Sequence, residues 1–270
     1  MLGPYDTQEY RIAVAGRTLR ILGPKHPHAL NDEPGYRQRF DADGYKPTWG
    51  QPWPAAVMLA EHMIGSLPLA GEKGTGSEPL RLCKKGTGTS PQRLGASPLF
   101  PALELGAGLG IAGLALTLAG YRVIITDCDE DALMFIRASA ALNGLTPHDV
   151  RLLDWRRPPA EQFPLILGSD IIFEQRSHPV LAELLVKCLT PDGQAFFSDQ
   201  NRTAADVFPR ALEAAGLTWE VGPARAKAIP AFDASDGRVL NGRIFRVGTR
   251  AATARAATAP SGTPTPGSSA

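Results

Sequence analysis

The sequence predicts an α/β fold in which a mostly parallel seven-stranded sheet carries helices on both faces, with a β-hairpin at the N-terminal end. Three observations predict it. Strand-like and helix-like segments alternate along the chain, a glycine-rich turn (Gly106–Gly110) joins a strand to a helix, and acidic residues follow successive strands. Repeated strand–helix–strand units are typical of a parallel sheet that is covered on both faces.

The strands are recognised by short apolar or β-branched runs. The first two, Tyr10–Val14 and Thr18–Leu22, are joined by three residues that include Gly16, so they read as a hairpin. Seven further strand-like segments are predicted for the sheet: Pro101–Leu105, Tyr121–Thr126, Val150–Leu153, Phe163–Gly168, Gln194–Ser198, Trp219–Val221 and Arg243–Val247.

The helices are recognised by apolar periodicity and by signals at their ends. The segment Trp53–Met63 has Pro54 in its first turn, where proline is favoured. The segment Glu130–Leu142 has acidic residues at its start and Asn143–Gly144 at its end. Thr203 with Asp206 resembles a capping box for a helix that ends at Gly216. The other predicted helices are Ile111–Ala119 and Pro179–Leu189.

The domain organisation follows from where glycine and proline gather. Half of residues 65–100 are Gly, Pro, Ser or Thr, and residues 249–270 contain only Ala, Thr, Pro, Ser, Gly and Arg. Neither segment offers enough apolar surface to offset its ordering entropy, so we expect a flexible insertion and a disordered tail. The alternative for the insertion is a substrate-binding lid. The remaining 212 residues suit one domain, 1–248, whose N-terminal hairpin arm covers 1–44.

Composition excludes several classes of partner. The formal net charge of +1 argues against nucleic-acid binding, which needs clustered Lys and Arg. No apolar run approaches the ~20 residues that span a bilayer, and the first residues lack the apolar block of a secretory signal. Three cysteines without paired or metal-type spacing fit a reducing cytoplasm. We therefore expect a cytoplasmic protein, monomeric, with no membrane or nucleic-acid partner and no metal.

The glycine-rich turn is the sharpest functional feature. The stretch Glu104-Leu-Gly106-Ala-Gly108-Leu-Gly110 leaves a strand and enters a helix, where glycines let the backbone approach a ligand closely. Two cofactors use such a turn, NAD and S-adenosylmethionine. The residues from Gly108 to Gly113 also match the dinucleotide pattern G-x-G-x-x-G, which is weak evidence alone.

Acidic residues favour S-adenosylmethionine on balance. Glu104, just before the turn, would repel a pyrophosphate, whereas S-adenosylmethionine has no phosphate and carries an amino group. Asp127 ends the next strand, where a carboxylate can hold ribose hydroxyls of either cofactor. Asp154 and Trp155 follow the third strand and offer a carboxylate and an aromatic face to an adenine. Each acidic residue alone could be a strand-end cap, but together they indicate cofactor binding.

The same residues resemble the class I methyltransferases of family 16, which modify lysines of proteins such as chaperones, calmodulin, elongation factors and the electron-transfer flavoprotein β subunit. The resemblance runs from about Tyr10 to Val247, is interrupted by the insertion, and is weakest after Leu217. It implies a Rossmann-like class I methyltransferase fold with S-adenosyl-L-methionine as cofactor. The matching stretches are GRTLRI, WGQPWPAAVMLAEHM, LELGAGLGIAGLALTLAG, YRVIITD, LLDW and LILGSDIIF.

The resemblance also implies roles for individual residues. Glu104, Gly106 and Gly108 would border the methionine part of the cofactor, Asp127 the ribose, and Asp154 with Trp155 the adenine. Three more residues are implied in cofactor binding: Trp53, Gly110 and Ser169. The family's Asp-x-x-Tyr signature stands here as Asp170-Ile-Ile-Phe173, which keeps an aromatic wall but loses the hydroxyl. Asp199-Gln-Asn-Arg202 resembles a variant of the Asp-Pro-Gly-Arg of some relatives.

The resemblance and the site chemistry lead to a protein-lysine N-methyltransferase. Asp170 would attract and orient the incoming ammonium, while Phe173, with Trp49 or Trp53, would hold it by cation–π attraction. Simple packing explains Phe173 equally well. Cys128 directly follows Asp127 and could contact the cofactor, but the expectation is a small buried side chain. The alternatives are a methyltransferase for a small amine or nitrogen heterocycle, a nicotinamide-dependent oxidoreductase, and a nucleotide-binding module without catalysis.

Overall fold

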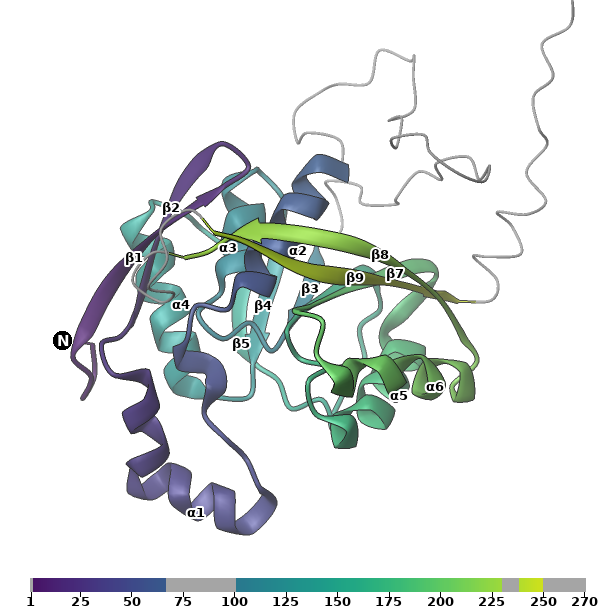
Figure 1. The fold of residues 1–270 in the computed structure, drawn as a ribbon, viewed down its shortest axis with the longest axis horizontal. Helices are drawn as coiled ribbons and strands as arrows, with labels where there is room; N and C mark the ends of the chain where they lie inside the picture. The colour runs from purple at the N-terminus through teal and green to yellow at the C-terminus, as the bar shows by residue number, and fades with distance from the viewer. Residues whose placement is uncertain (1, 67–100, 230–237, 250–270) are drawn as a thin grey trace, which may run out of the picture.

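The computed structural model of the chain describes residues 2–66, 101–229 and 238–249 (Figure 1). The predicted insertion lies outside these residues except for Gly65 and Ser66, which belong to a helix. The predicted tail also lies outside them except for Thr249, which is the last residue of a strand. Within the described part of the chain, no helix has the length and apolar composition needed to cross a membrane.

The sheet confirms the predicted architecture. Its seven strands lie in the order β5-β4-β3-β6-β7-β9-β8, and every neighbouring pair is parallel except the two that involve β9. The chain order reverses at β3, so the carboxyl ends of β3, β4 and β6 meet where such sheets bind ligands. The strands are β3 Ala102–Leu105, β4 Val123–Asp127, β5 Asp149–Leu152, β6 Phe163–Ser169, β7 Leu189–Asp199, β8 Leu217–Lys227 and β9 Val239–Thr249.

Helices cover both faces of the sheet, and each face has its own apolar core. Helices α2, α3 and α4 pack on one face, and α5 and α6 on the other (Figure 1). Successive side chains of β6 point to opposite faces of the sheet, so Leu165 and Leu167 belong to the first core and Ile166 to the second. The helices are α2 Pro54–Ser66, α3 Ile111–Leu118, α4 Glu130–Leu142, α5 His178–Cys188 and α6 Phe208–Ala214.

The predicted capping box is wrong. Thr203–Val207 forms a short 3-10 helix, η4, and α6 begins only at Phe208, with no capping hydrogen bond from a side chain. The reason is a distant competitor, because the carboxylate of Asp206 accepts a hydrogen bond of 2.6 Å from Arg243 on β9. The predicted end of the helical segment at Gly216 is sound, since this residue has a left-handed φ of 77°.

The N-terminal hairpin is confirmed and is longer than predicted. Strands β1 (Thr7–Val14) and β2 (Arg17–Pro24) pair antiparallel as a separate two-stranded sheet that joins the core of α2, α3 and α4. Helix α1 (Pro34–Asp43) was not predicted, because it has no apolar face at helical spacing and buries only Tyr36. Figure 1 shows α1 away from the sheet. Two short 3-10 turns flank it, η1 (Pro27–Asp32) and η2 (Thr48–Gly50).

A polar cluster attaches this N-terminal arm to the start of α4. Asp129, only 4% exposed, accepts hydrogen bonds from the hydroxyls of Tyr36 and Tyr45 and from Arg39, each at 3.0 Å. Asp129 is also the N-cap of α4, where it accepts from the Asp131 N–H at 3.1 Å. We call these five residues the arm cluster. It fixes residues 36–45 beside β4, and so places the following residues over the carboxyl edge of the sheet.

Removing the carboxylate at the centre of the arm cluster should destabilise the fold. Asp129→Ala deletes a helix cap, leaves Tyr45 and Arg39 without their buried acceptor, and leaves Tyr36 with only the part-buried Asp131. We expect a loss of about 2–4 kcal/mol in the free energy of unfolding, measured by urea denaturation. The control is Glu130→Ala, which removes the exposed carboxylate next in sequence. Equal losses in the two variants would contradict the role of the cluster.

Candidate functional site

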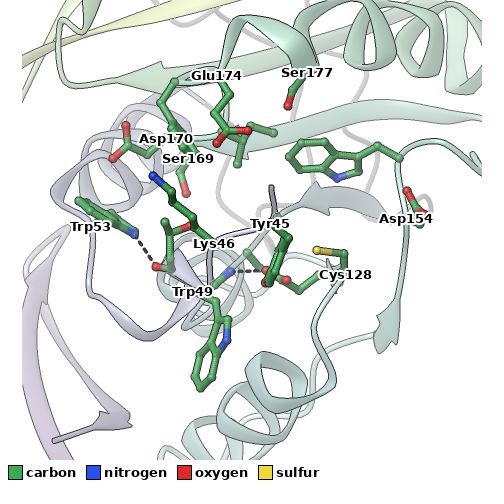
Figure 2. A pocket seen from close by; sticks show the side chains of 18 of the residues that line it. Tyr45, Lys46, Trp49, Trp53, Cys128, Asp154, Ser169, Asp170, Glu174 and Ser177 are labelled. Carbon is green, nitrogen blue, oxygen red and sulfur yellow. Dashed lines mark hydrogen bonds between the residues drawn. The ribbon is translucent and has the colours of Figure 1, made fainter. Parts of the chain in front are cut away.

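A cavity of about 590 Å³ opens at the carboxyl ends of β3, β4 and β6. Figure 2 shows Asp154 at one end of it and Trp53 and Asp170 at the other. Nine of the eleven predicted site residues line it: Trp53, Gly106, Gly108, Asp127, Asp154, Trp155, Ser169, Asp170 and Phe173. The two that do not are Glu104 and Gly110. The chain thus brings together residues that lie more than 100 positions apart.

The glycine turn forms the floor of the cavity because other parts of the chain approach its backbone closely. A Cβ at Gly106 would lie 2.9 Å from both Trp155 and Ile171, and one at Gly108 would lie 3.2 Å from the Trp49 carbonyl oxygen. Both glycines also have left-handed φ angles, 57° and 56°. The turn therefore forms a cradle of bare backbone at the cavity, packed closely against the segments that form its walls.

Asp127 stands at the end of β4, next to this cradle. Its carboxylate is 5% exposed and accepts hydrogen bonds from the N–H groups of Gly108 at 2.8 Å and Asp129 at 3.1 Å. Burial raises the pKa of Asp127 to about 6, although both N–H groups oppose this shift. Above that pH the cavity floor carries a fixed negative charge that can accept from hydroxyl groups.

Glu104 lies beneath the turn instead of in the cavity. Its side chain is fully buried on β3 and faces Gly113 of α3, where a Cβ would come within 2.2 Å of the Glu104 carboxylate. Neither carboxylate oxygen has a hydrogen-bond partner among the described residues. Burial raises the pKa of Glu104 to about 8. Gly110 is also set back from the cavity and packs against Ile136 of α4.

The adenine-side candidates lie at the rim. Asp154 makes a two-pronged ion pair with Arg156 at 2.8–2.9 Å, which lowers the pKa of the Asp154 carboxyl. Trp155 is half-buried and packs over Gly106. Cys128 also lines the cavity and is exposed, so the expectation of a small buried side chain is wrong: it lies just past the end of β4, where the chain has left the core.

The opposite end of the cavity is built around Asp170. This residue follows β6 with a φ of 56° and is 6% exposed. Each of its carboxylate oxygens accepts a hydrogen bond from a different side chain: one from the Arg202 guanidinium, and the other from the Gln200 amide at 2.7 Å. Burial raises the pKa of Asp170, and Arg202 opposes that shift.

Aromatic rings complete this end. The Arg202 guanidinium carbon lies 5.3 Å from the centroid of the Trp53 ring and 5.8 Å from that of Phe173. Trp53 is fixed by its indole N–H, which donates to the Thr48 carbonyl at 2.9 Å. Trp49, the other ring considered for a cation, points away from the cavity in Figure 2 and donates to Tyr36 in the core. Trp53 and Phe173 are therefore the aromatic walls.

Sequence reasoning missed the contribution of the N-terminal arm. Two arm residues, Arg39 and Asp43, line the cavity, and so do Tyr45 and Lys46, which directly follow the arm. Nothing in their local sequence signals this, because the contacts depend on the arm cluster. Arg202 was noted only as part of a sequence variant, without a role. Among the described residues, no group of three or more His, Cys, Asp or Glu side chains could hold a metal ion.

Fold and cavity together define a Rossmann-like class I methyltransferase. A family model described as lysine methyltransferase matches residues 48–213, more than half of the chain. The chain therefore belongs to the lysine methyltransferase family, whose cofactor is S-adenosylmethionine.

Two relatives and one solved structure show the extent of the similarity. EEF1A lysine methyltransferase 3 of Xenopus tropicalis is 34% identical over 106 residues, covering 37% of this chain and 46% of the relative. Protein N-lysine methyltransferase METTL21A of the same organism is 31% identical over 109 residues, covering 38% and 51%. The chain spans about half the length of the curated relatives it matches. A putative methyltransferase from Thermoplasma acidophilum superposes with a TM-score of 0.45 at 18% identity, covering 56% and 69%.

The residues present fit this cofactor. Gly106 and Gly108 present bare backbone to the cavity, and the lining also includes the Asp127 carboxylate and the half-buried ring of Trp155. A carboxylate beside bare backbone suits a ligand with hydroxyl and amino groups, and the ring offers a face for an adenine.

The buried Glu104 carboxylate predicts a pH-dependent stability. Its pKa in the folded protein, about 8, lies above the ordinary value of 4.5, so the folded state binds the proton more tightly. The contribution of Glu104 to the free energy of unfolding is then fully present below pH 4.5 and is lost as the pH rises through 8. Glu104→Gln should match the wild type near pH 5 and raise the thermal midpoint at pH 8.5 by roughly 5 °C or more. Glu130→Gln, at an exposed position, is the control, and parallel pH profiles for wild type and Glu104→Gln would contradict the prediction.

Proposed function

We propose that this protein transfers a methyl group from S-adenosylmethionine to the side-chain nitrogen of a lysine in another protein. The observation that carries the proposal is the shape of the cavity, which joins a cofactor cradle at Gly106 and Gly108 to an acidic and aromatic end at Asp170 and Phe173. Family membership supports the reaction, and the names of the matched relatives support a protein lysine as acceptor.

The cofactor would be held by the lining residues. The backbone at Gly106 and Gly108 would hold its methionine part, Asp127 would accept from the ribose hydroxyls, and Asp154 and Trp155 would flank the adenine. When bound, it supplies an electrophilic methyl group on a sulfonium. Four further residues would support cofactor binding: Trp53 and Ser169 from the acceptor side, and Glu104 and Gly110 by shaping the turn from beneath.

The chain's own residues would prepare the acceptor. A lysine amine has an ordinary pKa near ~10.4 and must lose a proton before its lone pair can attack. Asp170 would accept an N–H of the amine and so direct the lone pair, while Trp53 and Phe173 would exclude water from the reacting atoms. Phe173 has no hydroxyl, so it serves as a wall and the proton leaves to solvent.

A methyltransferase for a small amine would use the same chemistry. It would differ only in how much of the acceptor molecule lies outside the cavity. We favour a protein acceptor because the relatives are named for protein lysines. A cytoplasmic location fits as well, because the two cysteines in the described residues, Cys128 and Cys188, are free thiols, as reducing compartments maintain them.

Cofactor binding is tested by thermal shift. S-adenosylhomocysteine should raise the unfolding temperature of the wild type, because a ligand that binds only the folded state stabilises it. Asp127→Asn should lose most of this shift, since an amide is a weaker acceptor than a carboxylate for ribose hydroxyls. Asp41→Asn, at an exposed position of α1, should keep the full shift. Stabilisation by NAD or NADP alone would contradict the proposal.

Methyl transfer is tested with labelled S-adenosylmethionine and a lysate of the source organism. We expect a labelled protein band whose label resides on lysine. Asp170→Asn should slow labelling by roughly 100-fold or more, because the amine loses its orienting carboxylate while asparagine tolerates the left-handed backbone. Asp41→Asn again serves as the control. Label confined to the small-molecule fraction would support the alternative acceptor instead.

A further inference from the structure

Arg202 lies next to the end of the cavity where the acceptor nitrogen would bind, although it is not among the residues that line the cavity. It lies in the loop after β7, and its guanidinium contacts the Asp170 carboxylate while facing the rings of Trp53 and Phe173 at 5.3 and 5.8 Å. These are the carboxylate and the two aromatic walls assigned above to the acceptor. A cation of the protein itself therefore contacts the side chains that form the candidate acceptor site, from outside the cavity lining.

A network outside the cavity holds Arg202 in this place. Its backbone N–H donates to Asp199 at 2.9 Å, and its carbonyl accepts from Arg243 at 2.8 Å. Arg243 also contacts Asp199 at 3.2 Å and Asp206 at 2.6 Å. The three supporting residues do not line the cavity. With its backbone fixed on both sides, Arg202 has a defined direction toward Asp170.

The pairing changes what Asp170 offers to an acceptor. Arg202 takes one carboxylate oxygen and Gln200 the other, but each oxygen has a further lone pair. The remaining lone pairs can accept one N–H from an amine. The negative charge, however, is already balanced by the positive charge of the guanidinium. An ammonium entering here gains little from Asp170 and is repelled by Arg202.

Other charged groups around this end do not reverse the balance. Glu174 and Arg176 line the cavity and pair with each other at 2.7 Å, so they nearly cancel. Lys46 also lines it and adds positive charge. Asp43 lines the cavity as well and offsets Lys46. Arg243 is shared by Asp199, buried beneath the loop, and Asp206. The charged groups nearest the acceptor nitrogen, Asp170 and Arg202, thus form a neutral pair.

We propose, building on the proposed methyl transfer, that Arg202 is the specificity-determining residue that makes this site take its acceptor as an uncharged amine and reject the ammonium form. The acceptor leaves its proton in solvent and donates one N–H to Asp170. Its lone pair then forms the new N–C bond while the C–S electron pair returns to sulfur, so the positive charge passes to the product nitrogen. Arg202 repels that charged product and so favours its release.

A binding experiment tests this inference without requiring turnover. The probe is n-butylammonium, titrated calorimetrically at pH 7 in the presence of S-adenosylhomocysteine. Arg202→Met removes the charge and keeps an unbranched chain, so it should bind the probe roughly tenfold more tightly than wild type. Arg202→Lys keeps the charge and should bind like wild type. Arg246→Met, on β9 and not part of the cavity lining, is the control. Equal or weaker binding by Arg202→Met, or no binding to any variant, overturns the inference.

The pH profile of labelling separates this inference from the proposed function. In Arg202→Met the bound acceptor holds its proton more firmly, so the acid limb of the labelling rate should move about one pH unit higher. The rate should recover at high pH, and Arg202→Lys should restore the wild-type profile. Superimposed profiles for wild type and Arg202→Met would overturn the inference while leaving methyl transfer intact. Absence of labelled protein at every pH would instead count against the proposed function.

Discussion

The backbone turn between β3 and α3 is the constraint on which the site depends. At Gly106 and Gly108 other segments come so close that no Cβ would fit: Trp155 after β5, Ile171 after β6, and the Trp49 backbone that follows the N-terminal arm. Each approach brings one wall of the cavity to the same edge of the sheet. A side chain at either glycine would therefore push apart the segments that form the cavity as well as block its floor.

Buried carboxylates gather at this same edge, and each is compensated by a different part of the chain. Asp127 is held by backbone N–H groups, Asp129 by the arm, Asp170 by Arg202, and Asp199 by Arg243. A buried charge without such partners would cost several kcal/mol. Because these compensating groups come from distant segments, the arm and the loop after β7 are both held against this edge of the sheet. Glu104 is the exception: among the described residues its carboxylate has no hydrogen-bond partner, and burial raises its pKa to about 8.

Much of the fold could be predicted because its signals are local. Helix α4 has the predicted bounds, Glu130–Leu142, since its cap, its acidic first turn and its Asn-Gly end lie within the segment itself. The predicted capping box is wrong because a distant residue binds Asp206. Arg243, 37 positions further along the chain, donates a hydrogen bond to the Asp206 carboxylate. Helix α1 was not predicted for the opposite reason. It has no apolar stripe that a local pattern could show, and its position depends on the hydrogen bonds of the arm cluster.

The sequence by itself determined the class of fold, the glycine cradle, and the carboxylates that end successive strands, because strand and helix periods and turn chemistry act over a few residues. Only the tertiary structure decided which of these groups face the cavity. It set Glu104 beneath the turn, exposed Cys128, and placed Arg202 against Asp170. Such pairings depend on sheet order and on loops that meet across the edge, and no local pattern in the sequence encodes them.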